Sequence, residues 1–462
     1  MKIGFKPAVV TLTIVILLFL HLAILENAQC VIGSENSDFL KYVISDVFVG
    51  ELTHTIRITN PTQRRADGVN LYVPLVGNET ARHYVILYDV KSTEDYSLIS
   101  DSFGNIYLYW RNLTILQGQT FTVELDYRVL SFSLTYTVNS SMIKSYDKSS
   151  ELYMKYTQPE ELIESDNAEI IEKAQEITRG VDDPYVKVRL IYGFVVNYLR
   201  YEIQEDERGA LWALENHVGD CSEYSYLFVA LCRAAGIPAR IQAGFAFQFV
   251  GQFLKDGHMW AEYYLENYGW IPVDATWRLF NTMDGRHFSS IRSVPEVIPY
   301  ANYYINGTEV KLLDEQNVQL TALQPNMFDD DLFAQNITIA IQKIEQTETA
   351  VLLGKIFGVS LIFPAEIRRI EQKLQEARIY IQNAIDSWKN SAQIANINAQ
   401  TAFENAKNVL SDVWLLIFKA FAIYMAVLIT SLFIVLFFVR HSGKGLSKGA
   451  SISHIAQTAR KH

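Results

Sequence analysis

The chain has 462 residues, enough for two or three domains rather than one. Apolar residues make up 49% of it, which supports a packed core, and its formal net charge is −11. This acidic balance argues against a nucleic-acid partner, which requires a basic face. Three cysteines are too few for a disulfide framework.

The N-terminus carries the first of two long apolar stretches, residues 7–25, behind Lys2 and Lys6. A positive start followed by an apolar middle is typical of a secretory signal. Residues 1–30 are therefore predicted to be a signal peptide or an uncleaved signal anchor.

The next segment alternates between apolar and polar residues in short runs, for example residues 55–59 and 121–127. Turn-forming residues such as Asn60 and Pro61 separate these runs. Several short period-two strands with turns between them indicate an all-β sandwich. We predict this sandwich over residues 31–150 and find no catalytic cluster in it.

Helical patterns begin near Asp166 and lead to the run Gly219-Asp220-Cys221, which opens a helix that stops at Gly236. Unpaired backbone N–H groups and the helix dipole favour negative charge at a helix start. A thiol placed there ionises more easily, and the thiolate is the nucleophile. Cys221 is therefore a candidate nucleophile.

A candidate base and an orienting carboxylate follow this cysteine. His258 lies 37 positions after Cys221, and Asp274 lies 16 positions after His258. A strand over residues 258–265 and a second over 270–274 form a hairpin that can present both side chains to the helix. Taken singly, each residue has a structural explanation: a buried cysteine, a strand histidine and a capping aspartate. Together they favour nucleophilic thiol chemistry.

Four motifs stand in order in this part of the chain: Gly219-Asp220-Cys221, Ala235-Gly236-Ile237-Pro238-Ala239-Arg240, Gly257-His258-Met259-Trp260-Ala261-Glu262 and Gly269-Trp270-Ile271-Pro272-Val273-Asp274-Ala275-Thr276. Together they resemble the transglutaminase-like superfamily, which is related to papain-like cysteine proteases. The resemblance implies an α+β catalytic domain over residues 160–323, with Cys221, His258 and Asp274 as its catalytic triad.

The same resemblance implies acyl transfer through a thioester on peptide or glutamine amide bonds. The expected partner is a protein or peptide substrate at the cell surface. No cofactor or metal is expected, although calcium is left open. Water as the second substrate gives hydrolysis and a lysine amine gives a crosslink; the sequence does not choose between them.

Other residues near the motifs have less defined roles. Cys232 is expected in the core and His217 at the rim of the site. Glu223 and Glu262 are expected to support the site without a defined role. Four tryptophans either wall a substrate groove or pack in the core: Trp212, Trp260, Trp270 and Trp277.

The segment after the catalytic domain is predicted to connect it to a stalk. Within the connecting region, residues 324–364, the apolar run 353–363 is short and interrupted by Lys355, which favours a buried element over a membrane span. Residues 365–412 have apolar residues at heptad positions and are predicted to form a helical stalk. This helix either folds back on the ectodomain or extends as a coiled coil, through which a homo-oligomer could form.

The second long apolar stretch, residues 420–439, contains no charge and would span about 30 Å as a helix. We predict a transmembrane helix over residues 413–439 and a basic cytoplasmic tail over 440–462. The lipid bilayer is therefore an expected partner. The chain is expected to be a type I single-pass protein of the cell membrane with its catalytic domain outside.

Two classes of function fit these features. The first is a membrane-anchored extracellular thiol enzyme, either a cysteine protease or amidase, or a crosslinking acyl transferase. The second is a non-catalytic binding or scaffold ectodomain displayed on a membrane stalk. The complete set of Cys221, His258 and Asp274 favours the enzyme, because a degenerate module would be expected to lose at least one of them.

Overall fold

The computed structural model describes residues 40–77, 83–293, 295–323, 332–387 and 391–445. The chain forms two compact units. The globular unit comprises Phe39–Ile341 and Arg378–Gln400, and the helical unit contains Gln342–Ala377 and the residues from Thr401 onward. The predicted signal over residues 1–30 and the tail residues 446–462 lie outside the described residues.

The fold is mixed α+β, as predicted, and the globular unit contains a β-sandwich. One antiparallel sheet has the order β10-β17-β1-β6-β14, with β3 also paired to β6, and the other has the order β16-β2-β5-β4. A core of buried apolar side chains from both sheets, such as Leu52 and Trp110, holds them together. The strands are β1 (Tyr42–Thr59), β2 (Ala66–Pro74), β3 (His83–Lys91), β4 (Ser97–Ser100), β5 (Ile106–Ile115), β6 (Thr120–Tyr136), β10 (Phe253–Leu254), β14 (Thr282–Met283), β16 (Tyr304–Asn306) and β17 (Leu313–Ala322).

Two sandwich strands come from late in the chain. β17 pairs with β1 from Gly50 opposite Ala322 to Thr59 opposite Leu313, and β16 pairs with β2. These late strands complete the two sheets of the sandwich. Residues 313–322 thus pair in the sandwich sheet, although they fall within the range predicted for the catalytic domain.

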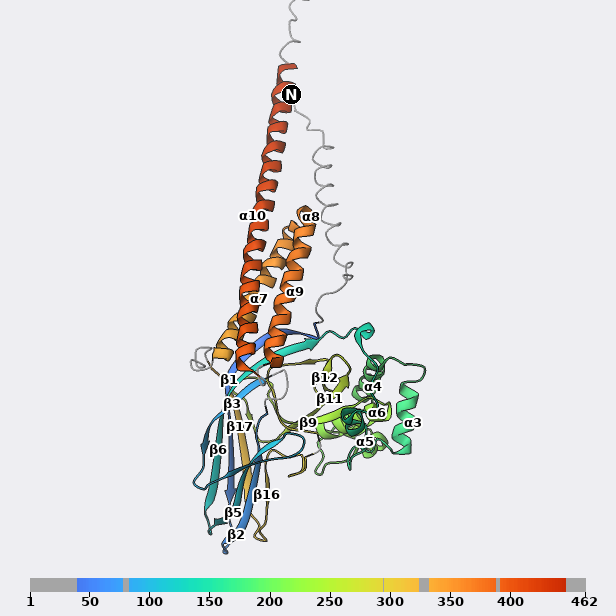
Figure 1. Ribbon diagram of the computed structural model, residues 1–462, viewed down its shortest axis with the longest axis vertical. Helices are drawn as coiled ribbons and strands as arrows, with labels where there is room; N and C mark the ends of the chain where they lie inside the picture. The colour runs from blue at the N-terminus through green and yellow to red at the C-terminus, as the bar shows by residue number, and fades with distance from the viewer. Residues whose placement is uncertain (1–39, 78–82, 294, 324–331, 388–390, 446–462) are drawn as a thin grey trace, which may run out of the picture. The chain divides into compact units, whose positions relative to one another are not determined.

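The rest of the globular unit packs helices against a five-stranded antiparallel sheet of order β13-β12-β11-β9-β15. Helices α3 to α6 gather beside β9, β11 and β12 (Figure 1). Helix α6 is buried along nearly its whole length, from Ser222 to Arg233, as expected of a helix with apolar residues on every side. The strands are β9 (Ala239–Ala246), β11 (His258–Leu265), β12 (Gly269–Asp274), β13 (Leu279–Phe280) and β15 (His287–Arg292). The helices are α3 (Ala168–Ile177), α4 (Pro184–Tyr198), α5 (Ala210–Asn216) and α6 (Cys221–Ala234).

Shorter elements link these parts. A 3₁₀ helix at Ser140–Met142 and helix α2 (Glu151–Tyr156) follow the sandwich. A parallel pair of two-residue strands, β7 (Arg200–Tyr201) and β8 (Val218–Gly219), brings the chain to the start of α6.

Four helices form the C-terminal part of the described chain: α7 (Leu332–Ile356), α8 (Val359–Ile362), α9 (Pro364–Ser387) and α10 (Ala392–Gly445). Within the helical unit, Val351 of α7, Ile370 of α9 and Val413 of α10 share one buried apolar cluster. The helices therefore pack as a bundle rather than as one extended rod. Helix α7 lies in the predicted connecting region and was not foreseen, because its apolar residues do not form a single stripe.

The apolar run 353–363 differs in part from its prediction. Five of its eleven residues are exposed, among them Ile356 and Phe357 at 63% and 61%, whereas Val359 is buried. The expectation of a buried element is met only in part: the run forms the tip of the hairpin between α7 and α9, and only its second half packs in the apolar cluster of the helical unit.

In the described part of the chain, one helix is long and apolar enough to cross a membrane. This is residues Ala392–Phe437 of α10, whose most apolar window is almost entirely exposed. That property is compatible with the predicted span over residues 413–439. The direction in which the helix would cross remains a prediction.

Candidate active site

Cys221 is the first residue of α6, and a reciprocal cap fixes its position. The Asp220 carboxylate accepts from the N–H of Ser222 at 3.0 Å, while the Glu223 carboxylate accepts from the N–H of Asp220 at 2.9 Å. Such a capping box satisfies two N–H groups that the helix leaves unpaired. Gly219 is required here, because a side chain at this position would clash with that of Glu223.

Glu223 also ties a second loop to the start of the helix. Its buried carboxylate accepts from the N–H of Arg208 at 2.8 Å, and Asp220 accepts from the N–H of Gln204 at 3.1 Å. Burial raises the pKa of Glu223, and these backbone hydrogen bonds only partly oppose that effect. Glu223 had no defined role from the sequence, and the structure shows that it holds the turn that presents Cys221.

His258 begins β11 and Asp274 ends β12, and these two strands pair antiparallel, as the sequence predicted. The hairpin brings the two side chains together, with His258 Nε2 at 2.7 Å from Asp274 Oδ2. The second oxygen of Asp274 accepts from the backbone N–H groups of Thr276 and Trp277, both at 2.9 Å. The carboxylate is therefore held in one orientation.

The Cys221 thiol lies within hydrogen-bond reach of the imidazole. Because Asp274 occupies Nε2 of His258, Nδ1 is the ring nitrogen that remains for the thiol. Burial lowers the pKa of His258, but hydrogen bonds and charges from Asp274 and Cys221 outweigh this effect and raise it to about 9. Burial acts to raise the pKa of Asp274, but hydrogen bonds from the two neighbouring histidines hold it well below its usual range.

The second of these histidines is His287, which the sequence analysis missed. It begins β15 and is fully buried, with Nε2 at 3.3 Å from Asp274 Oδ2 and Nδ1 at 3.0 Å from Asp284 Oδ1. Burial lowers the pKa of His287, yet hydrogen bonds with Asp274 and Asp284 raise it overall. The carboxylate that orients His258 is thus shared with a second imidazole.

His258, Asp274 and His287 also bring three possible metal ligands within 4.8 Å of one another. Two histidines and a carboxylate are a set that can hold a transition metal. Here both Nε2 atoms face the same carboxylate oxygen at hydrogen-bond distances, and the other oxygen is engaged by backbone N–H groups. We therefore describe the cluster as a hydrogen-bonded network.

Two tryptophans surround this network. Trp260 is buried, with its ring centroid 6.0 Å from that of His258 and 5.3 Å from that of His287. Trp277 is half-buried, at 5.3 Å from His258 and 4.7 Å from His287. Their apolar surfaces keep water from the imidazoles, which strengthens the electrostatic interactions inside the site.

The other two tryptophans contact arginines instead. Trp270 packs under Arg240 at 4.1 Å, and Trp212 lies 5.9 Å from Arg208. Arg240 in turn donates to Glu262, which gives that buried carboxylate a structural partner.

Cys232 lies in the core, as predicted, on the same helix as Cys221. Burial raises the pKa of Cys232 far above that of a free thiol. Its thiol should therefore resist ionisation and reaction.

Two further residues lie near the start of α6. His217 caps the end of α5 in a left-handed conformation (φ 62°), and its ring packs at a tilt against that of Tyr198, with the centroids 4.3 Å apart. Tyr201 lies opposite Gly219 in the β7–β8 pair and is half exposed. Burial is the largest cause of the raised pKa of Tyr201, and the charge of the neighbouring Cys221 is the second. The phenol of Tyr201 therefore lies near the thiol. The sequence gave no motif that could have identified this tyrosine.

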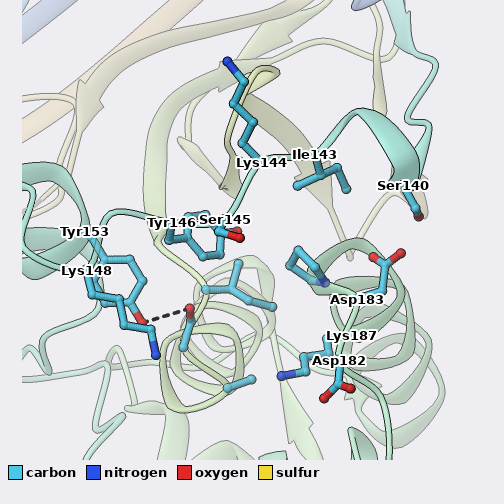
Figure 2. A pocket seen from close by; sticks show the side chains of 14 residues that line it. Ser140, Ile143, Lys144, Ser145, Tyr146, Lys148, Tyr153, Asp182, Asp183 and Lys187 are labelled. Atoms are coloured by element: carbon cyan, nitrogen blue, oxygen red, sulfur yellow. Dashed lines mark hydrogen bonds between the residues drawn. The ribbon is translucent and has the colours of Figure 1, made fainter.

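A pocket of about 500 Å³ lies at the opposite end of α6, lined by residues that include Ala235 and Gly236 (Figure 2). The hydroxyl of Tyr153 donates to the Gly236 carbonyl at 3.2 Å. Fourteen residues of helix separate this end from Cys221, about 20 Å. Its lysines, Lys144, Lys148 and Lys187, point in different directions. The pocket is therefore separate from the candidate active site and does not form a convergent anion site.

An α+β core in which a helix-start cysteine meets a strand histidine and a buried aspartate is an arrangement of thiol enzymes. The family model of the transglutaminase-like superfamily matches residues 171–275, which include all three side chains. The chain therefore carries a transglutaminase-like domain, as its motifs predicted.

Two relatives match short parts of the chain. A protein-glutamine gamma-glutamyltransferase from Pseudomonas aeruginosa is 37% identical over 70 residues, covering 13% of this chain and 10% of the relative. An uncharacterized protein from Haemophilus influenzae is 38% identical over 77 residues, covering 12% of this chain and 21% of the relative. The chain thus spans only a small part of either relative.

Solved structures resemble the chain at low sequence identity. A candidate cysteine protease from Cytophaga hutchinsonii is 17% identical, with a TM-score of 0.49 over 61% of this chain and 93% of that one. The periplasmic domain of TgpA from Pseudomonas aeruginosa, bound to ethylmercury, is 17% identical, with a TM-score of 0.27 over 53% of this chain and 98% of that one.

Proposed function

We propose that this protein is a thiol enzyme of the transglutaminase-like type that acts on peptide or glutamine amide bonds through a thioester. One observation carries the proposal: Asp274 holds Nε2 of His258 at 2.7 Å, which leaves Nδ1 for the thiol at the start of α6. A positioned base beside a nucleophile is the requirement for this chemistry. The name of the Pseudomonas aeruginosa transferase supports a glutamine side chain as one substrate class.

In the first half of the reaction, the Cys221 thiolate attacks the amide carbonyl carbon and forms a tetrahedral oxyanion. The N–H of Cys221 has no acceptor within its own helix, because it belongs to the first turn, and it can therefore donate to this oxyanion. Protonated His258 then gives its proton to the leaving amine. The C–N bond breaks, and the acyl group remains on sulfur as a thioester.

In the second half, water or a lysine amine attacks the thioester. His258 accepts the proton of the attacking group, the C–S bond breaks, and the thiolate is restored. Water yields an acid and so hydrolysis, whereas a lysine amine yields an isopeptide crosslink. Incubation with a glutamine peptide and a primary amine would distinguish the two, since only transfer incorporates the amine.

The proposal predicts a covalent adduct on only one of the two cysteines of the globular unit, which is tested in a Cys30→Ser background. A peptide- or glutamine-based electrophile should modify Cys221 in the folded protein and leave Cys232 unmodified, because burial both shields Cys232 and raises its pKa. Mass spectrometry of the digested protein identifies the site. Denatured protein is the control, in which both thiols should react with iodoacetamide. Equal modification of both cysteines in the native state would contradict the proposed site.

We further propose that α10 anchors the protein in the cell membrane as a type I single-pass helix, with the globular unit outside. The exposed apolar surface of α10 and the basic residues after it support this orientation. A homo-oligomer through the C-terminal helices stays a prediction.

The orientation predicts a protease-protection result. Protease added to intact cells should digest the globular unit and spare an epitope placed after Lys461, because the tail would lie inside. A cytoplasmic marker protein that stays uncut shows that the cell membrane is sealed. Loss of the tail epitope in sealed cells would reverse the orientation.

A further inference from the structure

The turn between α7 and α9 has an apolar, exposed tip. We define the hairpin tip as residues 352–363, in which Lys355 is the only charged residue. Its large apolar side chains include Leu352, Ile356 and Phe357, each more than half exposed. A cluster of this kind on a protein surface marks an interaction site rather than ordinary surface.

The hairpin tip lies beside the first turns of the apolar part of α10. The hydroxyl of Tyr424 donates to the Gly358 carbonyl at 3.4 Å, and a side chain added at Gly354 would lie 3.5 Å from Ile417. Tyr424 belongs to the uncharged residues 420–439, and all these contacts are within the helical unit. The exposed apolar surface of the tip is therefore continuous with that of α10.

Cationic side chains lie in the tip and at the adjoining ends of α9 and the apolar part of α10. Lys355 pairs with Glu371 at 2.5 Å, and Arg368, Arg369 and Lys419 are exposed near the ends of α9 and the apolar part of α10. Glu366 is the acidic residue of the first turn of α9. Long cationic side chains can extend to lipid phosphates while their stems stay in apolar surroundings. An apolar tip bordered by cations is the pattern of an element seated at a membrane surface.

We propose that the hairpin tip inserts into the leaflet that α10 enters first, as a shallow second membrane contact. The proposal rests on the membrane anchoring by α10 proposed above. Tyr424 lies five residues beyond Lys419, about 8 Å along the helix. That depth agrees with the roughly 5–10 Å to which interfacial helices enter a bilayer. The occupant is lipid, because the tip continues the surface of α10 that acyl chains would cover.

Insertion would fix how the helical unit meets the membrane. A single helix can rotate and tilt in a bilayer, and its tilt is set by neighbouring helices and interfacial anchors. A tip joined to α10 through the Gly358–Tyr424 hydrogen bond would supply such an anchor. The bundle would then be held against the surface of the bilayer.

Depth-dependent fluorescence quenching tests the proposal in the full chain. The chain is reconstituted in phosphatidylcholine–phosphatidylglycerol vesicles, with an environment-sensitive fluorophore on Ile356→Cys. The background carries Cys30→Ser and Cys221→Ala. Gln342→Cys, exposed on the same helix about 21 Å before the tip, is the matched control. Val427→Cys is the reference for a deep position in α10.

Lipids spin-labelled at acyl carbon 5 should quench the Ile356 label several-fold more than lipids labelled at carbon 12. The Val427 label should show the reverse order, and the Gln342 label should be quenched by neither. Phe357→Cys should repeat the Ile356 result, which guards against a local effect of one label.

Three outcomes would overturn the proposal. An unquenched Ile356 label beside a quenched Val427 label would place the tip outside the bilayer and leave the anchor intact. Absence of quenching at both positions would remove the anchor and the proposal together. Energy transfer between Ile356 labels on different copies, without lipid quenching, would mean that a second copy covers the tip.

Discussion

Replacing Cys221 with alanine is expected to abolish turnover of a peptide or glutamine substrate while leaving the fold intact. The substitution removes the proposed nucleophile. In a well-studied serine protease, loss of the nucleophile costs on the order of 10⁶ in kcat, which sets the scale expected here. The fold should survive, because Asp220 and Glu223 form the capping box and the Cys221 side chain takes no part in it.

The matched control is Cys232→Ala, the same substitution at the other cysteine of α6, 11 positions further along the helix. It should keep turnover and lose a modest amount of stability, since it only removes a buried sulfur atom. Substrate turnover is measured with circular dichroism as the folding check. Wild-type turnover in Cys221→Ala would reject the enzyme and favour the non-catalytic binding module.

Local patterns predicted much of the fold. The alternation in residues 121–127 lies within β6, and the motifs around His258 and Asp274 gave the β11–β12 hairpin, because period and turn residues are local signals. The return of β17 to pair with β1 was not predicted, since nothing in residues 313–322 specifies a partner more than 200 positions away. Helix α7 was missed because its apolar residues are not gathered on one face of the helix.

The candidate site was predicted only as far as its motifs extend. Cys221, His258 and Asp274 stand in recognisable motifs, and the structure places them together. His287 has no motif. It reaches Asp274 only because β15 pairs with the edge of β9 that faces away from β11. Glu223 was visible as a residue near the cysteine, but its contact with Arg208 depends on how a loop folds.

The protonation of His258 predicts that activity falls on the basic side of the pH profile. The His258 pKa is raised to about 9, so this residue stays protonated at neutral pH and can protonate the leaving amine. The activity that depends on this proton should fall as pH rises through about 9. The stability that the His258–Asp274 pair provides follows the same sign: it is complete below the unfolded pKa of about 6.5 and is lost as pH rises through about 9.

Asp274→Asn is expected to lower kcat/KM by on the order of 10⁴, the scale seen for the equivalent change in a serine protease. Asp274 Oδ1 accepts two backbone N–H groups, while Oδ2 faces His258 and His287. Asparagine has one carbonyl oxygen, which the two backbone N–H groups would retain. Its NH₂ group would then face His258 Nε2 and force the proton onto Nδ1, so that nitrogen could no longer accept the proton of the thiol.

His287→Gln is the matched comparison, because it removes the second imidazole on the same carboxylate and leaves the His258–Asp274 hydrogen bond in place. It should cost far less than Asp274→Asn. The pH profile separates the two further: loss of the carboxylate charge should move the basic limb of Asp274→Asn below pH 9, whereas His287→Gln should retain it near 9. Nitrogen-15 NMR of the His258 ring reports the tautomer directly. Near-wild-type kcat/KM in a folded Asp274→Asn variant, with the Nε2 proton retained, would show that Asp274 does not orient the base.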